Sequence, residues 1–228
     1  MKKLFLIVFS LTVTAYSFSA FESTYEPLQF EKVLFINGNI LDGEGNELLD
    51  TDLLIGDGKI IAVGKGISVD DPDVKIIDAK NKWITPGIID IHSHMGVYPA
   101  PSVRTSSDGN EATSPVTAEV WAEHSMWVQD PQYALALKGG VTTFHVLPGS
   151  ANLIGGRGVT VKNLQRNTIQ SMKYPDAKHS LKMACGENPK RVYGNRGQAP
   201  STRMGNFAGY RKAWIEAENY LNKLEAYD

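Results

Sequence analysis

The chain has 228 residues, of which 42% are hydrophobic and 21% charged, and its 23 Lys and Arg nearly balance its 25 Asp and Glu. This balance, without a basic stripe along the sequence, argues against nucleic acid as a partner and gives no support for attraction to a membrane surface. Cys185 is the only cysteine, which excludes an intramolecular disulfide, so stability has to come from a hydrophobic core.

The N-terminal residues have the pattern of a secretory leader. Two lysines at positions 2 and 3 precede an apolar run over residues 4–16, and small residues follow up to Ala20. We predict a signal peptide over residues 1–20, cleaved after Ala20, and therefore a secreted or periplasmic protein. The alternative is an uncleaved N-terminal anchor. No later stretch is apolar for long enough to cross a bilayer, so a processed chain is expected to have no stable membrane anchor.

Residues 21–86 contain short apolar runs separated by turn residues. Asn37-Gly38 and Asp57-Gly58 are the clearest turn signals, because both positions of a tight hairpin turn need a positive φ. This segment is predicted to form a small domain built on an antiparallel sheet.

Residues 87–228 have a different pattern, in which strands and helices alternate. Strands are expected at 87–94, 141–147 and 181–185, and helices at 117–128 and from Asp130-Pro131 to Gly139-Gly140. Such alternation is typical of parallel β/α units. A closed eight-unit barrel takes roughly 250 residues. The prediction is therefore the N-terminal part of an incomplete (β/α)8 TIM-type barrel.

A final helix is predicted from the apolar positions between Phe207 and Leu224, which are spaced three and four residues apart. Asn206 is its expected N-cap. The apolar stripe predicts a core-facing helix, and no further element follows on which it could pack. The chain as it stands is therefore expected to be truncated.

The strongest chemical signal is a pair of histidines at the end of the first predicted barrel strand. Side chains alternate along a strand, so Asp90, His92 and His94 share one face, which would look into the barrel near its mouth. Two imidazoles at this spacing can bind one metal ion through their ring nitrogens. Asp90 would then lie behind the ligands. The alternative is a chance His-x-His pair on an exposed strand.

The segment Pro86-Gly87-Ile88-Ile89-Asp90-Ile91-His92-Ser93-His94 resembles the first-strand signature of the amidohydrolase superfamily. The later stretches Gly140-Val141-Thr142-Thr143 and 147–156 resemble the imidazolonepropionase-like branch. The resemblance implies a urease-like β-sandwich beside a distorted metal-dependent hydrolase barrel, with one or two divalent metal ions, usually zinc. It also implies two further histidines and a catalytic aspartate, for which no counterpart precedes Asp228.

A further metal ligand is expected near the strand at 181–185. Glu187 follows Gly186 just past the strand end, and in some members of the superfamily a glutamate replaces a modified lysine as ligand. The alternative is a solvated loop carboxylate. Lys182, as a carbamylated bridge, is a weaker candidate, since lysines that flank strands are commonly charged rims. His145 is expected to be a core or rim histidine, and Cys185 to be buried and structural.

These observations support one main functional hypothesis and two alternatives. The main hypothesis is a hydrolase that cleaves carbon–nitrogen bonds, in amides, peptides or cyclic amides, with a metal-activated water. Its substrate would be a small molecule or peptide. The first alternative is a catalytically inactive fragment. The second is a metal-binding or interaction protein that completes its barrel with another chain, a homo-oligomer included.

Overall fold

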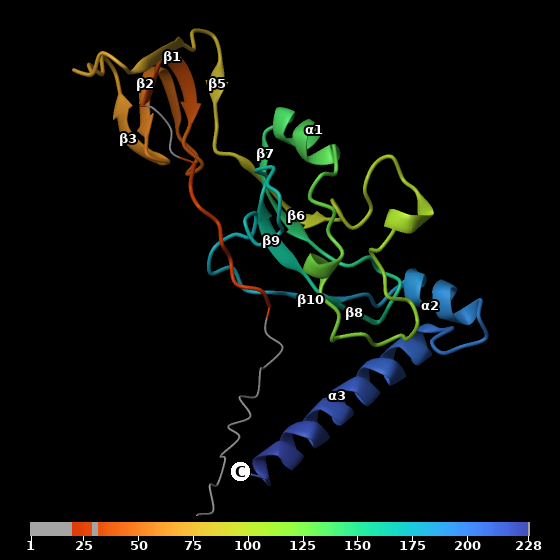
Figure 1. Ribbon diagram of the computed structural model, residues 1–228. Helices are drawn as coiled ribbons and strands as arrows, with labels where there is room; N and C mark the ends of the chain where they lie inside the picture. The colour runs from red at the N-terminus through yellow and green to blue at the C-terminus, as the bar shows by residue number, and fades with distance from the viewer. Residues whose placement is uncertain (1–19, 29–31, 228) are drawn as a thin grey trace, which may run out of the picture.

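The computed structural model describes residues 20–28 and 32–227 (Figure 1). The predicted signal peptide lies outside the described residues, apart from Ala20. The chain first forms a sheet, then a β/α region, and ends in two helices.

The first sheet has five strands in the order β3-β2-β1-β4, with β5 also paired to β1 (Figure 1). Its strands are β1 (Val33–Leu41), β2 (Glu47–Gly56), β3 (Lys59–Gly64), β4 (Lys75–Asp78) and β5 (Trp83–Ile84). The β1, β2 and β3 strands pair antiparallel, as predicted, and Asp57 and Gly58 have the positive φ values of a tight turn. However, β4 and β5 pair with β1 in parallel, so the sheet is mixed.

The prediction of a turn at Asn37-Gly38 is wrong, because both residues lie inside β1. Asn37 has a φ of 58°, and the register with β2 shifts between Phe35 and Gly38, so the pair forms a bulge. The Asn37 N–H donates to Asp52 Oδ1 over 3.0 Å, which satisfies the donor that the bulge removes from the ladder.

The β/α region begins with β6 (Ile88–Ser93), which pairs in parallel with β7 (Val141–Val146). Between them, α1 (Gln132–Lys138) ends at Gly139 as predicted, and Gly140 has a φ of 85°. The remaining strands pair antiparallel, β9 (Val159–Lys162) with β7 and β10 (Leu181–Met183) with β8 (Ile154–Arg157). The expected α/β class is confirmed.

The core of this region lies between β7, β9 and the segments that cover them. Phe144 and Val146 on β7 are fully buried, as are Val161 on β9 and Met172. At the start of β6, Gly87 is so close to β7 that a Cβ atom there would overlap the side chain of Thr142. This close approach fixes where β6 enters the sheet and hence where its far end lies.

The predicted helix over 117–128 is wrong. Only a single 3-10 turn, η2 (Ala122–His124), forms there. The Thr117 N–H donates to Ile154 O, and the Arg157 N–H donates to Val120 O, both over 2.8 Å. The backbone therefore pairs with β8 instead of with itself. A second 3-10 turn, η1 (Arg104–Ser106), lies in the preceding loop.

Two helices, α2 (Glu187–Gly194) and α3 (Arg203–Glu225), end the chain. The predicted cap of α3 is wrong: Thr202 is the N-cap, and its hydroxyl accepts from the Gly205 N–H over 3.1 Å. Asn206 is buried instead, and donates to the carbonyls of Cys185 and Gly186. These bonds tie the start of α3 to the chain that follows β10.

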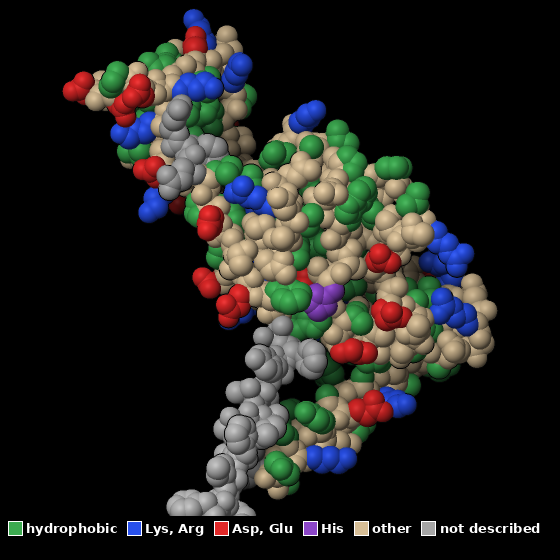
Figure 2. All heavy atoms as spheres, viewed as in Figure 1, with side chains coloured by type: hydrophobic (Ala, Val, Ile, Leu, Met, Phe, Trp, Pro, Cys, Tyr) green, Lys and Arg blue, Asp and Glu red, His purple; other side chains and the backbone are tan. Residues whose placement is uncertain are grey.

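The apolar stripe of α3 is not buried. Phe207, Trp214 and Leu221 are each more than half exposed, and α3 extends away from the β/α region (Figure 1). Acidic and basic side chains are interspersed over the visible face (Figure 2). Among the helices of the described residues, none combines the length and apolarity that crossing a bilayer requires.

Candidate metal centre

His92 and His94 lie together at the C-terminal end of β6. Their ring centroids are 5.5 Å apart and their planes are perpendicular. His94 Nδ1 is 2.8 Å from the carbonyl oxygen of Leu147, at the end of the neighbouring strand β7. A carbonyl can only accept a hydrogen bond, so Nδ1 carries a proton, and in the neutral ring Nε2 then keeps its lone pair. This orienting contact is typical of metal-binding histidines.

Lys182 brings a third side chain to this pair. It lies on β10, its side chain is buried, and its Nζ is 3.0 Å from His92 Nε2. Within the described residues no carboxylate lies at ion-pair distance from this ammonium. Burial lowers the pKa of Lys182. The positive charge of Lys182 in turn lowers the pKa of His92, assisted by burial and by His94, and Asp90 opposes this only in part.

The two predicted carboxylates lie in different places. The Oδ1 of Asp90 accepts the backbone N–H of His92 over 3.0 Å, and its supporting role stays a prediction. Glu187 begins α2, where its largely exposed carboxylate pairs with Arg191 over 3.2 Å. Within the described ranges, His, Cys, Asp and Glu side chains do not gather in any group of three that could hold a metal ion. The role of Glu187 as a ligand stays a prediction.

A cleft of about 320 Å³ opens beside His94. Its walls come from the loop after β6, the loop after β7 and helix α2, and its polar side chains include Tyr98, Asn110, Ser150, Asn188 and Arg191. Tyr98 donates to Asn110 over 2.7 Å, and Asn188 donates to Ser150 over 2.6 Å. These bonds hold the polar lining in place next to the histidine pair.

Two other residues considered in the sequence analysis, His145 and Cys185, lie in different environments. His145 is held by hydroxyls on both ring nitrogens, Thr160 at 2.9 Å and Ser180 at 2.7 Å, which agrees with a core role. Burial, followed by the charges of His179 and His92, lowers its pKa. Cys185 is exposed, so the prediction of a buried cysteine is wrong. The strand β10 ends at Met183, two residues before it.

The geometry shows two features that the sequence analysis missed. The first is the Leu147 carbonyl, because backbone acceptors carry no sequence signal. The second is the contact of Lys182 with His92 across 90 positions of sequence. The only signal for Lys182 in the sequence was its position between apolar residues on a predicted strand. That position predicts a buried side chain only if the strand lies inside the fold.

No family model matches the chain, but known proteins and solved structures that are similar to it are found. Amidohydrolase tasK of Hapsidospora irregularis is 35% identical over 185 residues, covering 76% of this chain and 19% of that protein. A dihydroorotase of Bacillus cytotoxicus is 33% identical over 117 residues, which cover 51% of this chain and 21% of that protein. The structure of an amidohydrolase from Thermotoga maritima MSB8 superposes with a TM-score of 0.76 at 41% identity, covering 85% of this chain and 49% of that one.

The sequence and the fold together define part of a β/α barrel with a histidine pair at the end of its first strand. The chain is similar to members of the amidohydrolase superfamily over 76% and 85% of its own length, and it spans about a fifth of the curated relatives and about half of the Thermotoga maritima structure. Its assignment to the imidazolonepropionase-like branch stays a prediction.

Proposed function

We propose that the full-length protein is a metal-dependent hydrolase of carbon–nitrogen bonds. The observation that carries the proposal is the cluster formed by His92 and His94 at the end of β6 and Lys182 on β10, in which Nε2 of a neutral His94 can accept a metal ion. The amidohydrolase and dihydroorotase names of its relatives support the same chemistry.

The donor set fits a divalent metal ion such as zinc. Neutral imidazole nitrogens are preferred zinc ligands, and the Leu147 carbonyl holds His94 in the tautomer that can bind. One or two ions would be held by His92 and His94 together with a third ligand. A bound metal would lower the pKa of a water molecule so that it can attack a carbonyl carbon near neutral pH.

The geometry favours Lys182 over Glu187 as the third ligand. Addition of carbon dioxide to the Lys182 amine, with loss of a proton, would form a carbamate whose oxygens extend beyond Nζ toward the histidines. Glu187 would have to leave Arg191 and swing in from the exposed start of α2. Asp90 holds the backbone of His92, so its role is to position the imidazole.

The cleft beside His94 supplies the substrate side of the proposal. Its volume of about 320 Å³ suits a small molecule or the end of a peptide, and its amide and hydroxyl groups can orient an amide. Arg191 adds a cation that could pair with a substrate carboxylate once Glu187 is displaced. One of the relatives is named a dihydroorotase, which is consistent with a cyclic amide as substrate.

The test is the zinc content of the purified full-length protein. We expect the His92→Ala/His94→Ala double variant to lose stoichiometric zinc and chelator-sensitive amide hydrolysis. The matched control is His179→Ala, because His179 contacts the Gly158 carbonyl and not the pair. Equal zinc in the parent and the double variant would contradict the proposal.

A second candidate role is association through uncovered surfaces. The exposed apolar stripe of α3, and the exposed Ile89 and Ile91 on β6, favour a homo-oligomer or a complex with another chain. Gel filtration of the chain over residues 21–228 would test this. A compact monomer would argue against association.

A further inference from the structure

A buried ion pair lies away from the metal centre. Glu123, on η2, and Lys173, after β9, approach to 2.6 Å, and their side chains are 0% and 7% exposed. A charge pair this deeply buried needs each of its polar atoms to be satisfied. Lys173 Nζ satisfies Oε2 of Glu123, which leaves Oε1 to find another donor.

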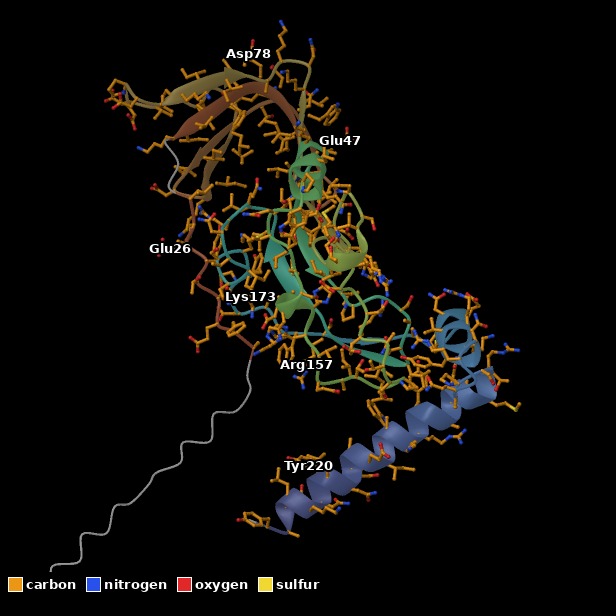
Figure 3. The ribbon with its side chains drawn as sticks, turned by 45° about the vertical axis from the view of Figure 1, so that its right-hand side comes forward. Glu26, Glu47, Asp78, Arg157, Lys173 and Tyr220 are labelled. Atoms are coloured by element: carbon orange, nitrogen blue, oxygen red, sulfur yellow. The ribbon has the colours of Figure 1, made fainter. Side chains whose placement is uncertain are left out.

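The backbone of Phe21 completes the pair on both sides. Its N–H donates to Glu123 Oε1 over 3.2 Å, and its carbonyl oxygen accepts from Lys173 Nζ. The next residues are held as well, since Ser23 Oγ donates to Lys173 O over 2.8 Å and Thr24 N donates to Gln170 O over 3.0 Å. Figure 3 shows Lys173 beside the N-terminal segment that runs down from Glu26.

The nitrogen that meets this carboxylate is the one that cleavage after Ala20 would free. Ser19 and Ala20 are small residues that follow the apolar run, as a leader peptidase requires. The structure thus places a buried acceptor at the first atom of the expected mature chain. An ordinary amide there uses one hydrogen bond, whereas an ammonium group would add a full charge and two more donors.

We propose that the protein is cut between Ala20 and Phe21, and that the carboxylate of Glu123 then binds the new α-ammonium group of Phe21. The two carboxylate oxygens then each face one cation, Lys173 on Oε2 and the α-ammonium on Oε1. The site lies at the surface on its outer side, because Phe21 is 53% exposed. The ammonium therefore keeps part of its hydration, which limits both its desolvation and its repulsion with Lys173.

The neighbouring side chains are compatible with this arrangement. The ring of Phe21 packs edge-on against His124, with centroids 5.3 Å apart. His124 Nε2 lies 3.7 Å from Glu123 Oε1, too far for a hydrogen bond and on an exposed side chain. Proteolytic removal of the leader would therefore strengthen the attachment of residues 21–24 to the β/α region. This inference does not depend on the proposed hydrolase activity.

The first experiment is N-terminal sequencing of the full-length protein, expressed with its leader and recovered after export. We expect the mature chain to begin at Phe21. An uncut chain would overturn the proposal, and so would cleavage one residue earlier, after Ser19, because the α-ammonium would then belong to Ala20.

The second experiment compares two forms of the leaderless full-length protein, one that begins at Phe21 and one with Gly-Ser before it. The extension replaces the α-ammonium with an amide, so we expect it to lower Tm by about 5 °C. In a Glu123→Gln background the same extension should change Tm by much less. In the matched control, Glu22→Gln, an exposed neighbouring carboxylate is removed and the full effect should remain. Equal effects in all three backgrounds would overturn the proposal.

A third measurement covers the case in which Glu123→Gln does not fold. The acylation rate of the Phe21 amine, followed by mass spectrometry of the N-terminal peptide, should be at least about tenfold slower in the folded parent than in urea. The amine of Lys212 serves as an internal reference, since its ion pair with Glu216 is open to solvent. An amine that reacts equally fast in both states would overturn the proposal.

Discussion

Two buried lysines in the β/α region differ in what they face. Lys173 lies against the buried carboxylate of Glu123, whereas Lys182 lies against the imidazole of His92. A buried ammonium beside a carboxylate is compensated, and removing either partner leaves the other uncompensated. A buried ammonium beside a neutral ring lacks that compensation, and its lowered pKa reflects this. The comparison indicates that Lys173 serves stability and Lys182 serves the site.

The largest expected effect is the loss of stability when Lys173 is substituted. Lys173→Met should lower the free energy of unfolding by about 3–5 kcal/mol, because Oε2 of the buried Glu123 would lose the ammonium that pairs with it. Urea unfolding of the full-length protein measures this. Lys32→Met is the control, since Lys32 pairs with Asp71 at the surface, and its loss should be much smaller. Similar losses of stability in both variants would contradict the distinction between the buried and the exposed ion pair.

The next largest expected effect is the stabilisation of the fold by zinc bound beside Lys182. Zinc at about 100 times its Kd should raise the free energy of unfolding by about 2.7 kcal/mol, and a chelator should reverse the gain. Thermal unfolding with and without zinc measures it. A His92→Ala/His94→Ala variant should show no gain. A gain of the same size in that variant would place the zinc elsewhere.

Substitution of Lys182 should have a smaller effect on stability. Lys182→Met keeps the length of the side chain and removes an uncompensated ammonium, so the free energy of unfolding should change by no more than about 1 kcal/mol. Zinc affinity should nevertheless fall by at least about tenfold. Titration with a zinc-buffered indicator measures the affinity. A stability loss as large as that of Lys173→Met would contradict the comparison.

The smallest expected effect is that of Glu187→Gln. Its exposed pair with Arg191 spans one helical turn, and such pairs contribute about 0.3–0.5 kcal/mol. Zinc affinity should be unchanged if Lys182 supplies the third ligand. A fall in zinc affinity with Glu187→Gln, together with none for Lys182→Met, would instead establish Glu187 as the ligand.

Local pattern was sufficient to predict the histidine pair. The two-residue period of a strand puts His92 and His94 on one face, and the helix stop at Gly139-Gly140 leads into the neighbouring strand as expected. The fold class followed from the alternation of elements, and the comparison with known structures confirms it. The close contact of Lys182 with His92 could not be predicted, because it depends on where the chain places β10, which lies in another sheet, relative to β6.

Two of the wrong predictions share one physical cause, which is tertiary bonding that overrides local preference. Residues 117–128 have acceptable helix-forming content, but β8 offers their backbone donors and acceptors partners. Asn206 is a good cap residue, yet its amide is used to satisfy two carbonyls after β10, and Thr202 caps the helix instead. Neither competing partner is adjacent in sequence, so neither could be read from a local window.

The glycine that opens β6 owes its place to strand pairing. Any side chain at position 87 would collide with Thr142, so β6 and β7 can keep their separation only if this position stays bare. A methyl group there would tilt β6 about its entry point, and the displacement would grow along the strand to its far end. Selection for a well-formed sheet would therefore be enough to keep Gly87, even in a descendant that had given up metal binding altogether.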